Sequence, residues 1–114
     1  MESEAKSVKE VFERMPQTFI KEKAVGLNAV VQFDITGEGG GRWIAAITDG
    51  ELSVSEGERS DPNLTLTAGA EDYLAISTGR LSGQLAFMTG RIRAKGDLGL
   101  AMKMQLLFEQ PTPR

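Results

Sequence analysis

The sequence contains no cysteine and no histidine. The absence of cysteine excludes disulfides, thiolate nucleophiles and the usual structural zinc sites. Without either residue, the common pairs of nucleophile and base cannot form, so any acid–base chemistry would depend on carboxylates, lysine or tyrosine. The sequence therefore argues against an enzyme of the common hydrolytic classes.

Long hydrophobic and long basic runs are also missing. No apolar run reaches the roughly 18 residues of a membrane span, and residues 1–6 lack the core of a signal peptide. A formal net charge of -3 argues against a dedicated nucleic-acid binder. With 40% hydrophobic and 25% charged residues, the 114-residue chain is typical of one soluble globular domain. We expect a cytoplasmic protein with a single domain over residues 1–114 and frayed tails at 1–6 and 109–114.

Residues 7–26 predict two helical segments. Ser7 and Glu10 have the spacing of a capping box, and hydrophobic residues then recur at helical intervals. Pro16 lacks the N–H that a continuing helix would use. We therefore expect the first helix to end near Met15, and Pro16 to open a separate turn of helix.

Five segments alternate hydrophobic and polar residues, which is the period of a strand with one buried face. They lie at residues 27–36, 42–48, 51–56 and 64–66 and between Gly90 and Gly96. Three further helices are expected at residues 71–77, 81–88 and 97–108, the last being hydrophobic on nearly every side. Because each strand has one apolar face, all helices should pack on the same side of the sheet. We predict an α+β fold.

Fragments spread along the chain carry a resemblance to a known family. They include residues 30–37, 63–66, 71–74, 100–103 and, above all, AFMTGRIRAKGD at residues 86–97. Taken in this order, from about Val8 to Phe108, the sequence resembles the sterol carrier protein 2 domain. The resemblance implies a mixed five-stranded sheet, helices on one face, and a hydrophobic tunnel between them for fatty acyl chains, acyl-CoA or sterols. It brings no catalytic residues, and we expect no cofactor and no metal.

The residues expected to line such a tunnel come from the inward faces of the predicted strands and helices. For any one of them, filling the core is the simpler interpretation. Several flexible methionines and a last helix with two hydrophobic faces favour a cavity for the group, although a dimer interface would explain the second face equally well. The predicted lining residues are Phe33, Ile35, Trp43, Ile47, Leu52, Leu66, Leu74, Phe87, Met88, Met102, Leu106 and Phe108.

Other polar features allow two interpretations each. Arg91, Arg93 and Lys95 form a basic stripe that could meet an acyl-CoA phosphate or an anionic membrane, but a solvated sheet face is simpler. Asp34 would be the candidate general base, yet nothing in the sequence indicates its burial. Tyr73 fits equally well as a core residue and as a polar group in a pocket.

We predict non-catalytic binding and transfer of an apolar lipid, whether a fatty acid, an acyl-CoA or a sterol-like ligand. The chain ends in Thr112-Pro113-Arg114 and not in a peroxisomal targeting tripeptide, so we expect a stand-alone prokaryotic-type copy and favour acyl chains over sterols. Transient contact with a membrane or an enzyme is expected, nucleic acid is not, and a homodimer is left open. The alternatives are an accessory or dimerisation module that presents a lipid-like substrate to a partner enzyme, and a small enzyme acting on such a substrate.

Overall fold

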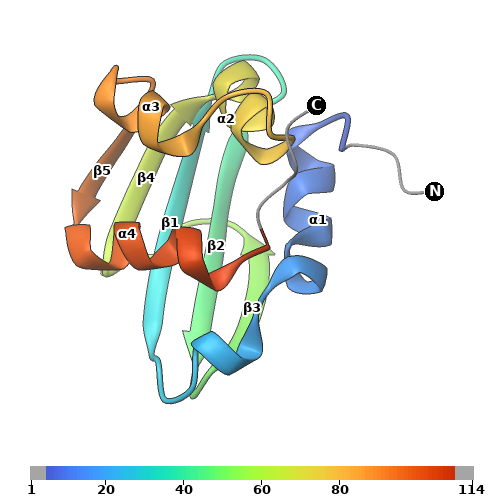
Figure 1. Cartoon of the computed structure of the whole chain (residues 1–114). Helices are drawn as coiled ribbons and strands as arrows, with labels where there is room; N and C mark the ends of the chain where they lie inside the picture. Colours follow the sequence, from blue (N-terminus) through green and yellow to red (C-terminus); the bar gives the residue numbers. More distant parts are fainter. Residues whose placement is uncertain (1–4, 110–114) are drawn as a thin grey trace.

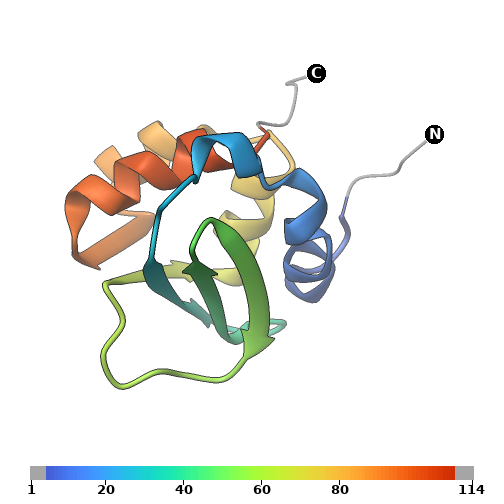
Figure 2. The same cartoon turned by 90° about the horizontal axis from the view of Figure 1, so that it is seen from below.

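Four helices lie on one face of a five-stranded sheet in the computed structural model, which describes residues 5–109 (Figures 1 and 2). The strand order is β3-β2-β1-β4-β5; β1 and β4 run parallel and the other neighbours antiparallel. The predicted α+β fold with a mixed five-stranded sheet is thus confirmed. The elements are α1 (Val8–Thr18), the 3-10 helix η1 (Lys21–Lys23), β1 (Ala29–Thr36), β2 (Gly41–Thr48), β3 (Glu51–Glu56), β4 (Leu64–Gly69), α2 (Ala70–Ser77), α3 (Gly83–Met88), β5 (Ile92–Gly96) and α4 (Leu98–Leu107).

The first helix is longer than its sequence predicts. The expected end near Met15 is wrong, because α1 continues through Pro16 to Thr18. Proline removes a single backbone hydrogen bond in this last turn. Burial of Phe12 and Met15 holds the helix on the sheet, and the Thr18 hydroxyl donates a hydrogen bond to the Met15 carbonyl at 3.1 Å.

An aromatic cluster fills the space between α1, α2 and the centre of the sheet. The Phe12 ring stacks on Trp43 with centroids 4.7 Å apart and on Tyr73 with centroids 5.3 Å apart. The rings of Phe12 and Phe33 form a T-shaped pair with centroids 5.1 Å apart, and all four residues are buried. The side chain of Phe12 therefore joins two helices to two strands. This arrangement decides the question left open for Tyr73, which belongs to the core.

The other face of the sheet is not uniformly solvated. Gln32 of β1 points away from the helices and is nevertheless only 4% exposed, because the loop after β3 folds over it (Figure 2). Its amide nitrogen donates to the Gly57 carbonyl at 3.0 Å, and its amide oxygen accepts from the Arg59 N–H at 2.8 Å. Gln32 thus fixes the path of this loop across the outer face.

Replacing Gln32 with alanine should lower the free energy of unfolding by about 1–3 kcal/mol, because two backbone groups of the loop lose their partner. Urea denaturation would measure the change. Gln17→Ala is the matched control, since Gln17 is exposed on α1. If the two variants were equally stable, the side chain of Gln32 would not hold the loop.

The segment that follows α1 pairs with the segment that follows α4. Phe19 and Phe108 form an antiparallel bridge, and their ring centroids lie 5.4 Å apart. The Ile20 N–H donates to the Leu107 carbonyl at 2.7 Å, and the Glu109 N–H donates to the Thr18 carbonyl at 2.8 Å. Most of the tails expected to be frayed, residues 1–4 and 110–114, lie outside the described residues.

Candidate functional site

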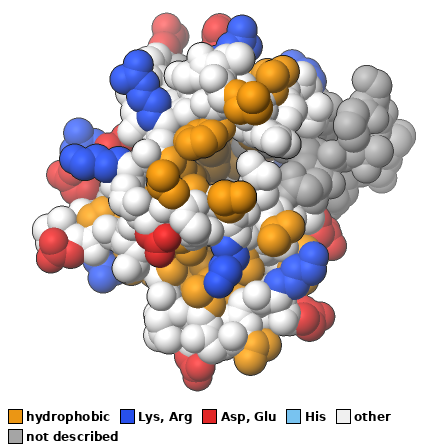
Figure 3. Space-filling model, turned by 60° about the vertical axis from the view of Figure 1, so that its left-hand side comes forward, with side chains coloured by type: hydrophobic (Ala, Val, Ile, Leu, Met, Phe, Trp, Pro, Cys, Tyr) orange, Lys and Arg blue, Asp and Glu red, His pale blue; other side chains and the backbone are white. Residues whose placement is uncertain are grey.

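Hydrophobic side chains are concentrated on the solvent-facing surface of α3 and α4. Within residues 5–109, six of the seven exposed large hydrophobic residues come from these two helices, and each of the six is 50–75% exposed. Figure 3 shows hydrophobic side chains gathered around a hollow on the corresponding side of the molecule. We call these six residues the apolar rim: Leu85, Phe87, Met88, Leu98, Met102 and Leu106.

The sheet beneath the rim is incompletely covered. Leu66 pairs with Phe33 on one side and with Ala94 on the other, so all three face the helices. Phe33 is buried under α1 and α2, whereas Leu66, Ile92 and Ala94 are only partly buried. An apolar residue on an interior strand is normally fully covered. Leu64 and Ala68, on the same face of β4, are buried, so the cover is incomplete only over Leu66, Ile92 and Ala94. We call these three residues the floor, and the space above them, next to α3 and α4, the groove.

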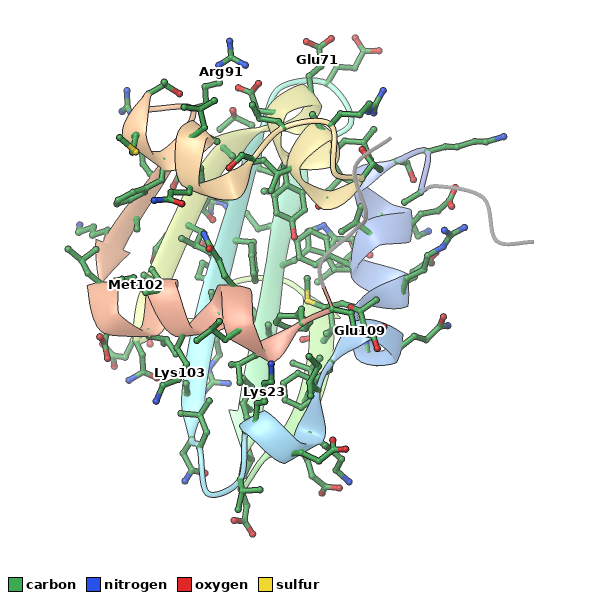
Figure 4. The ribbon with its side chains drawn as sticks, viewed as in Figure 1. Lys23, Glu71, Arg91, Met102, Lys103 and Glu109 are labelled. Carbon is green, nitrogen blue, oxygen red and sulfur yellow. The ribbon has the colours of Figure 1, made fainter. Side chains whose placement is uncertain are left out.

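The helix α4 presents apolar residues on two sides. Asp97 caps it by accepting a hydrogen bond from the Leu100 N–H at 3.1 Å. Leu100, Met104 and Leu107 recur at helical spacing and are buried. The rim residues Leu98, Met102 and Leu106 are exposed. Met102 lies on the edge of α4 that faces α3, and Lys103 lies on the opposite edge (Figure 4). Only one of these two apolar sides is therefore used by the core.

Close backbone packing fixes the start of α4. Gly96 has φ +113°, and a Cβ at this position would lie 2.5 Å from the Asn63 carbonyl oxygen. The next N–H, that of Asp97, donates to the same oxygen at 2.9 Å. A glycine is needed here because a side chain would force β5 away from the end of the loop before β4. The chain then turns directly from β5 into α4.

The helix α3 is short and begins close to α4. Ser82 caps it by accepting a hydrogen bond from the Leu85 N–H at 3.3 Å. At the first residue of α3, a Cβ on Gly83 would lie 3.5 Å from Nε2 of Gln105. Only Ala86 of α3 is buried, so the rest of this helix is available to line the groove or to face solvent.

The structure places the predicted lining residues in three environments. Four are buried in the core: Phe33, Ile35, Trp43 and Ile47. Four are partly buried: Leu52, Leu66, Leu74 and Phe108. Four are exposed in the apolar rim: Phe87, Met88, Met102 and Leu106. Leu66 lies on the face of the sheet that the helices cover and the four rim residues lie on the exposed surface of α3 and α4, while Trp43 and Phe33 lie in the aromatic cluster. Leu85, Ile92, Ala94 and Leu98 were missing from the predicted set, although the alternation of β5 already places Ile92 and Ala94 inward.

The polar candidates lie away from the groove. Asp34 is on the outer face of the sheet, where Nε of Arg42 is 3.7 Å from its carboxylate. Arg91 and Arg93 border a hollow of about 290 Å³ that also includes Thr36 and Thr67. A second hollow of about 320 Å³, near Asn63 and Lys103, is lined by a different set of residues from those predicted. Burial raises the pKa of the Tyr73 hydroxyl above its ordinary value, as expected for a core residue.

Comparison with known proteins identifies the family. Residues 8–109 match the model of the SCP-2 sterol transfer family. The chain belongs to this family. Membership implies lipid binding and transfer as the general role of an SCP-2 domain.

Similar SCP-2 domains occur in longer proteins. Hydroxysteroid dehydrogenase-like protein 2 of Mus musculus is 30% identical over 109 residues, which cover 95% of this chain and 22% of that protein. Sterol carrier protein 2 of Homo sapiens is 29% identical over 109 residues, which cover 93% of this chain and 19% of that protein. The chain therefore spans about a fifth of the length of these curated relatives.

Solved structures share the fold. Palmitated SCP2L2 from Aedes aegypti has a TM-score of 0.73 and 31% identity, covering 93% of this chain and 98% of that one. The sec-alkyl sulfatase PisA1 has a TM-score of 0.80 at 16% identity, covering 94% of this chain and 17% of that one, which shows the same fold within an enzyme. Between residues 5 and 109, none of the helices has the length and hydrophobicity needed to span a bilayer.

Proposed function

We propose that this SCP-2 domain binds a single acyl chain in the groove between α3, α4 and the β4–β5 floor, and releases it unchanged. The observation that supports this site is the half-buried position of Leu66, on an interior strand and on the face that the helices cover. The residues around it, Ile92, Ala94 and the apolar rim, offer an apolar ligand further surface to contact.

The lining favours an acyl chain over a rigid ring system. Met88 and Met102 have flexible thioether side chains that adapt to ligands of different shape. Burying roughly ten methylene groups at about 0.8 kcal/mol each gives about 8 kcal/mol before the costs of association. That value allows affinity in the micromolar range, which is weak enough for release to an acceptor.

Native mass spectrometry of protein purified without detergent should show one bound lipid per protein molecule, and that lipid should have a single acyl chain. Organic extraction would then identify the lipid. The apo protein should bind a fluorescent fatty acid with about micromolar affinity. Protein that carries no lipid and also fails to bind the fluorescent fatty acid would rule out the carrier role.

The absence of catalysis is part of the same proposal. The chain lacks histidine and cysteine, the Tyr73 hydroxyl is buried, and Asp34 lies on the opposite face of the sheet from the groove. These residues offer no acid or base next to a bound acyl chain. The cytoplasmic location stays a prediction from the sequence.

A second candidate function is presentation of a lipid-like substrate to an enzyme. The observation that favours it is the occurrence of the same domain in a dehydrogenase-like protein and the same fold in an alkyl sulfatase. In that case the groove would hold the substrate while another domain or protein performs the reaction. The carrier role and the presentation role use the same groove, and they differ in whether the bound lipid passes to an acceptor or to an enzyme.

A further inference from the structure

The methionines of this protein occupy two contrasting environments. The chain has five methionines and no cysteine, so thioethers are its only sulfur groups. Of the four methionines that the structure describes, Met15 and Met104 are each 8% exposed, whereas Met88 is 73% and Met102 is 75% exposed. These last two are the most exposed residues of the apolar rim. The rim therefore presents two oxidisable sulfur atoms to solvent.

A methionine sulfur can give two electrons to a hydroperoxide. The O–O bond of hydrogen peroxide breaks, an S–O bond forms, and the second oxygen leaves as water. The flexible apolar thioether becomes a polar sulfoxide. Because the oxidant must reach the sulfur, the exposed pair Met88 and Met102 should react, while burial should protect Met15 and Met104.

Both exposed methionines lie beside the groove. Met102 is on the edge of α4 that faces α3 (Figure 4). Met88 is the last residue of α3, which lies against β5, the strand that contributes Ile92 and Ala94 to the floor. Each of the two helices next to the groove thus carries one accessible sulfur.

We propose that Met88 and Met102 are modification sites for hydroperoxides, and that their oxidation to sulfoxides weakens the binding of an acyl chain in the groove. A bound chain that covers an apolar side chain gains from the contact, whereas covering a sulfoxide removes hydrogen bonds between its oxygen and water. Methionine sulfoxide reductases, whose thiols supply the two electrons, should restore binding. The proposal rests on the proposed function, because it needs an acyl chain in the groove.

Mass spectrometry of the folded protein after treatment with hydrogen peroxide tests the modification. Trypsin cleaves after Lys103 and so separates Met102 from Met104. The peptides with Met88 and Met102 should gain one oxygen atom about tenfold faster than those with Met15 and Met104. Equal rates at all four methionines would contradict the assignment of the two sites.

Fluorescent fatty-acid titration tests the consequence. Oxidised wild-type protein should bind the fatty acid about five- to tenfold more weakly than untreated protein, and reductases for both sulfoxide epimers should reverse this loss. Circular dichroism should show the same fold before and after treatment. Unchanged affinity in protein whose Met88 and Met102 are fully oxidised would overturn the proposal.

Two double variants are each compared before and after peroxide. Met88→Leu/Met102→Leu removes both exposed sulfur atoms at similar volume, so its affinity should change by less than about twofold on treatment. Met15→Leu/Met104→Leu removes the two buried sulfur atoms and should lose affinity as the wild type does. A loss that persists in Met88→Leu/Met102→Leu would overturn the proposal.

The outcome can be separated from the fate of the proposed function. Untreated wild-type protein that binds the fatty acid supports the carrier role, whatever peroxide then does. If that protein bound equally well after oxidation of Met88 and Met102, the modification proposal alone would be refuted. Untreated protein that binds no fatty acid would refute the carrier role and this proposal with it.

Discussion

Replacing Phe12 with alanine is expected to lower the free energy of unfolding by about 3–5 kcal/mol. The ring is 1% exposed and contacts Trp43, Tyr73 and Phe33, which come from β2, α2 and β1. Its removal leaves a cavity where two helices meet the sheet, and rigid aromatic neighbours cannot collapse to fill it. Since domains are stable by only about 5–15 kcal/mol, this is a large fraction of the total.

Thermal and urea denaturation would measure the effect of Phe12→Ala, with an expected decrease in Tm of about 10–20 °C. The fluorescence of Trp43, the only tryptophan, reports directly on the cluster because the two rings stack at 4.7 Å. Phe87→Ala is the matched control, since that ring is 50% exposed on α3. Equal destabilisation by both changes would contradict the central role of Phe12.

Replacing Ala94 with tryptophan should weaken fatty-acid binding by about tenfold or more while leaving the fold intact. Ala94 is paired with Leu66 and faces the helices from the half-buried floor of the groove. An indole at this position would occupy space proposed for the ligand, and tryptophan is well tolerated in strands. A tenfold loss corresponds to about 1.4 kcal/mol of binding free energy.

The control for Ala94→Trp is Lys95→Trp, which adds the same ring at the next residue of the strand and on the opposite face of the sheet. Fluorescent fatty-acid titration should distinguish the two variants, and circular dichroism should show that both are folded. If Ala94→Trp bound the fatty acid as tightly as Lys95→Trp, the ligand would have to lie elsewhere, for example deeper among the core residues.

Local signals in the sequence were sufficient to predict most of the fold. Alternation placed the strands to within a few residues, and Asp49 and Gly50 both take positive φ, as their hairpin turn requires. The end of α1 was wrongly predicted. The prediction took into account the backbone hydrogen bond that Pro16 cannot donate, but not the burial of Phe12 on the sheet. No local signal marks Gln32 as buried, because the loop that covers it comes 25 residues later in the chain.

The candidate site was less predictable for a related reason. Periodicity assigns Phe33, Leu66 and Met102 an apolar environment but does not say whether a neighbour, a ligand or solvent provides it. The structure separates them, since Phe33 is buried by α1, Leu66 is half-buried and Met102 is exposed. Which of them is covered depends on where α1, α3 and α4 lie on the sheet. No local pattern encodes the positions of these helices.

The bridge between Phe19 and Phe108 holds α4 in place, whereas α3 on the other side of the groove is held less tightly. Moving α4 away from the sheet would break three backbone hydrogen bonds to other parts of the chain, at Thr18, Ile20 and Asn63. Within the described residues, every backbone hydrogen bond of α3 is local, so lifting it would cost only side-chain contacts. If the groove binds an acyl chain as proposed, a longer or wider ligand would be accommodated by displacement of α3, while α4 would stay in place.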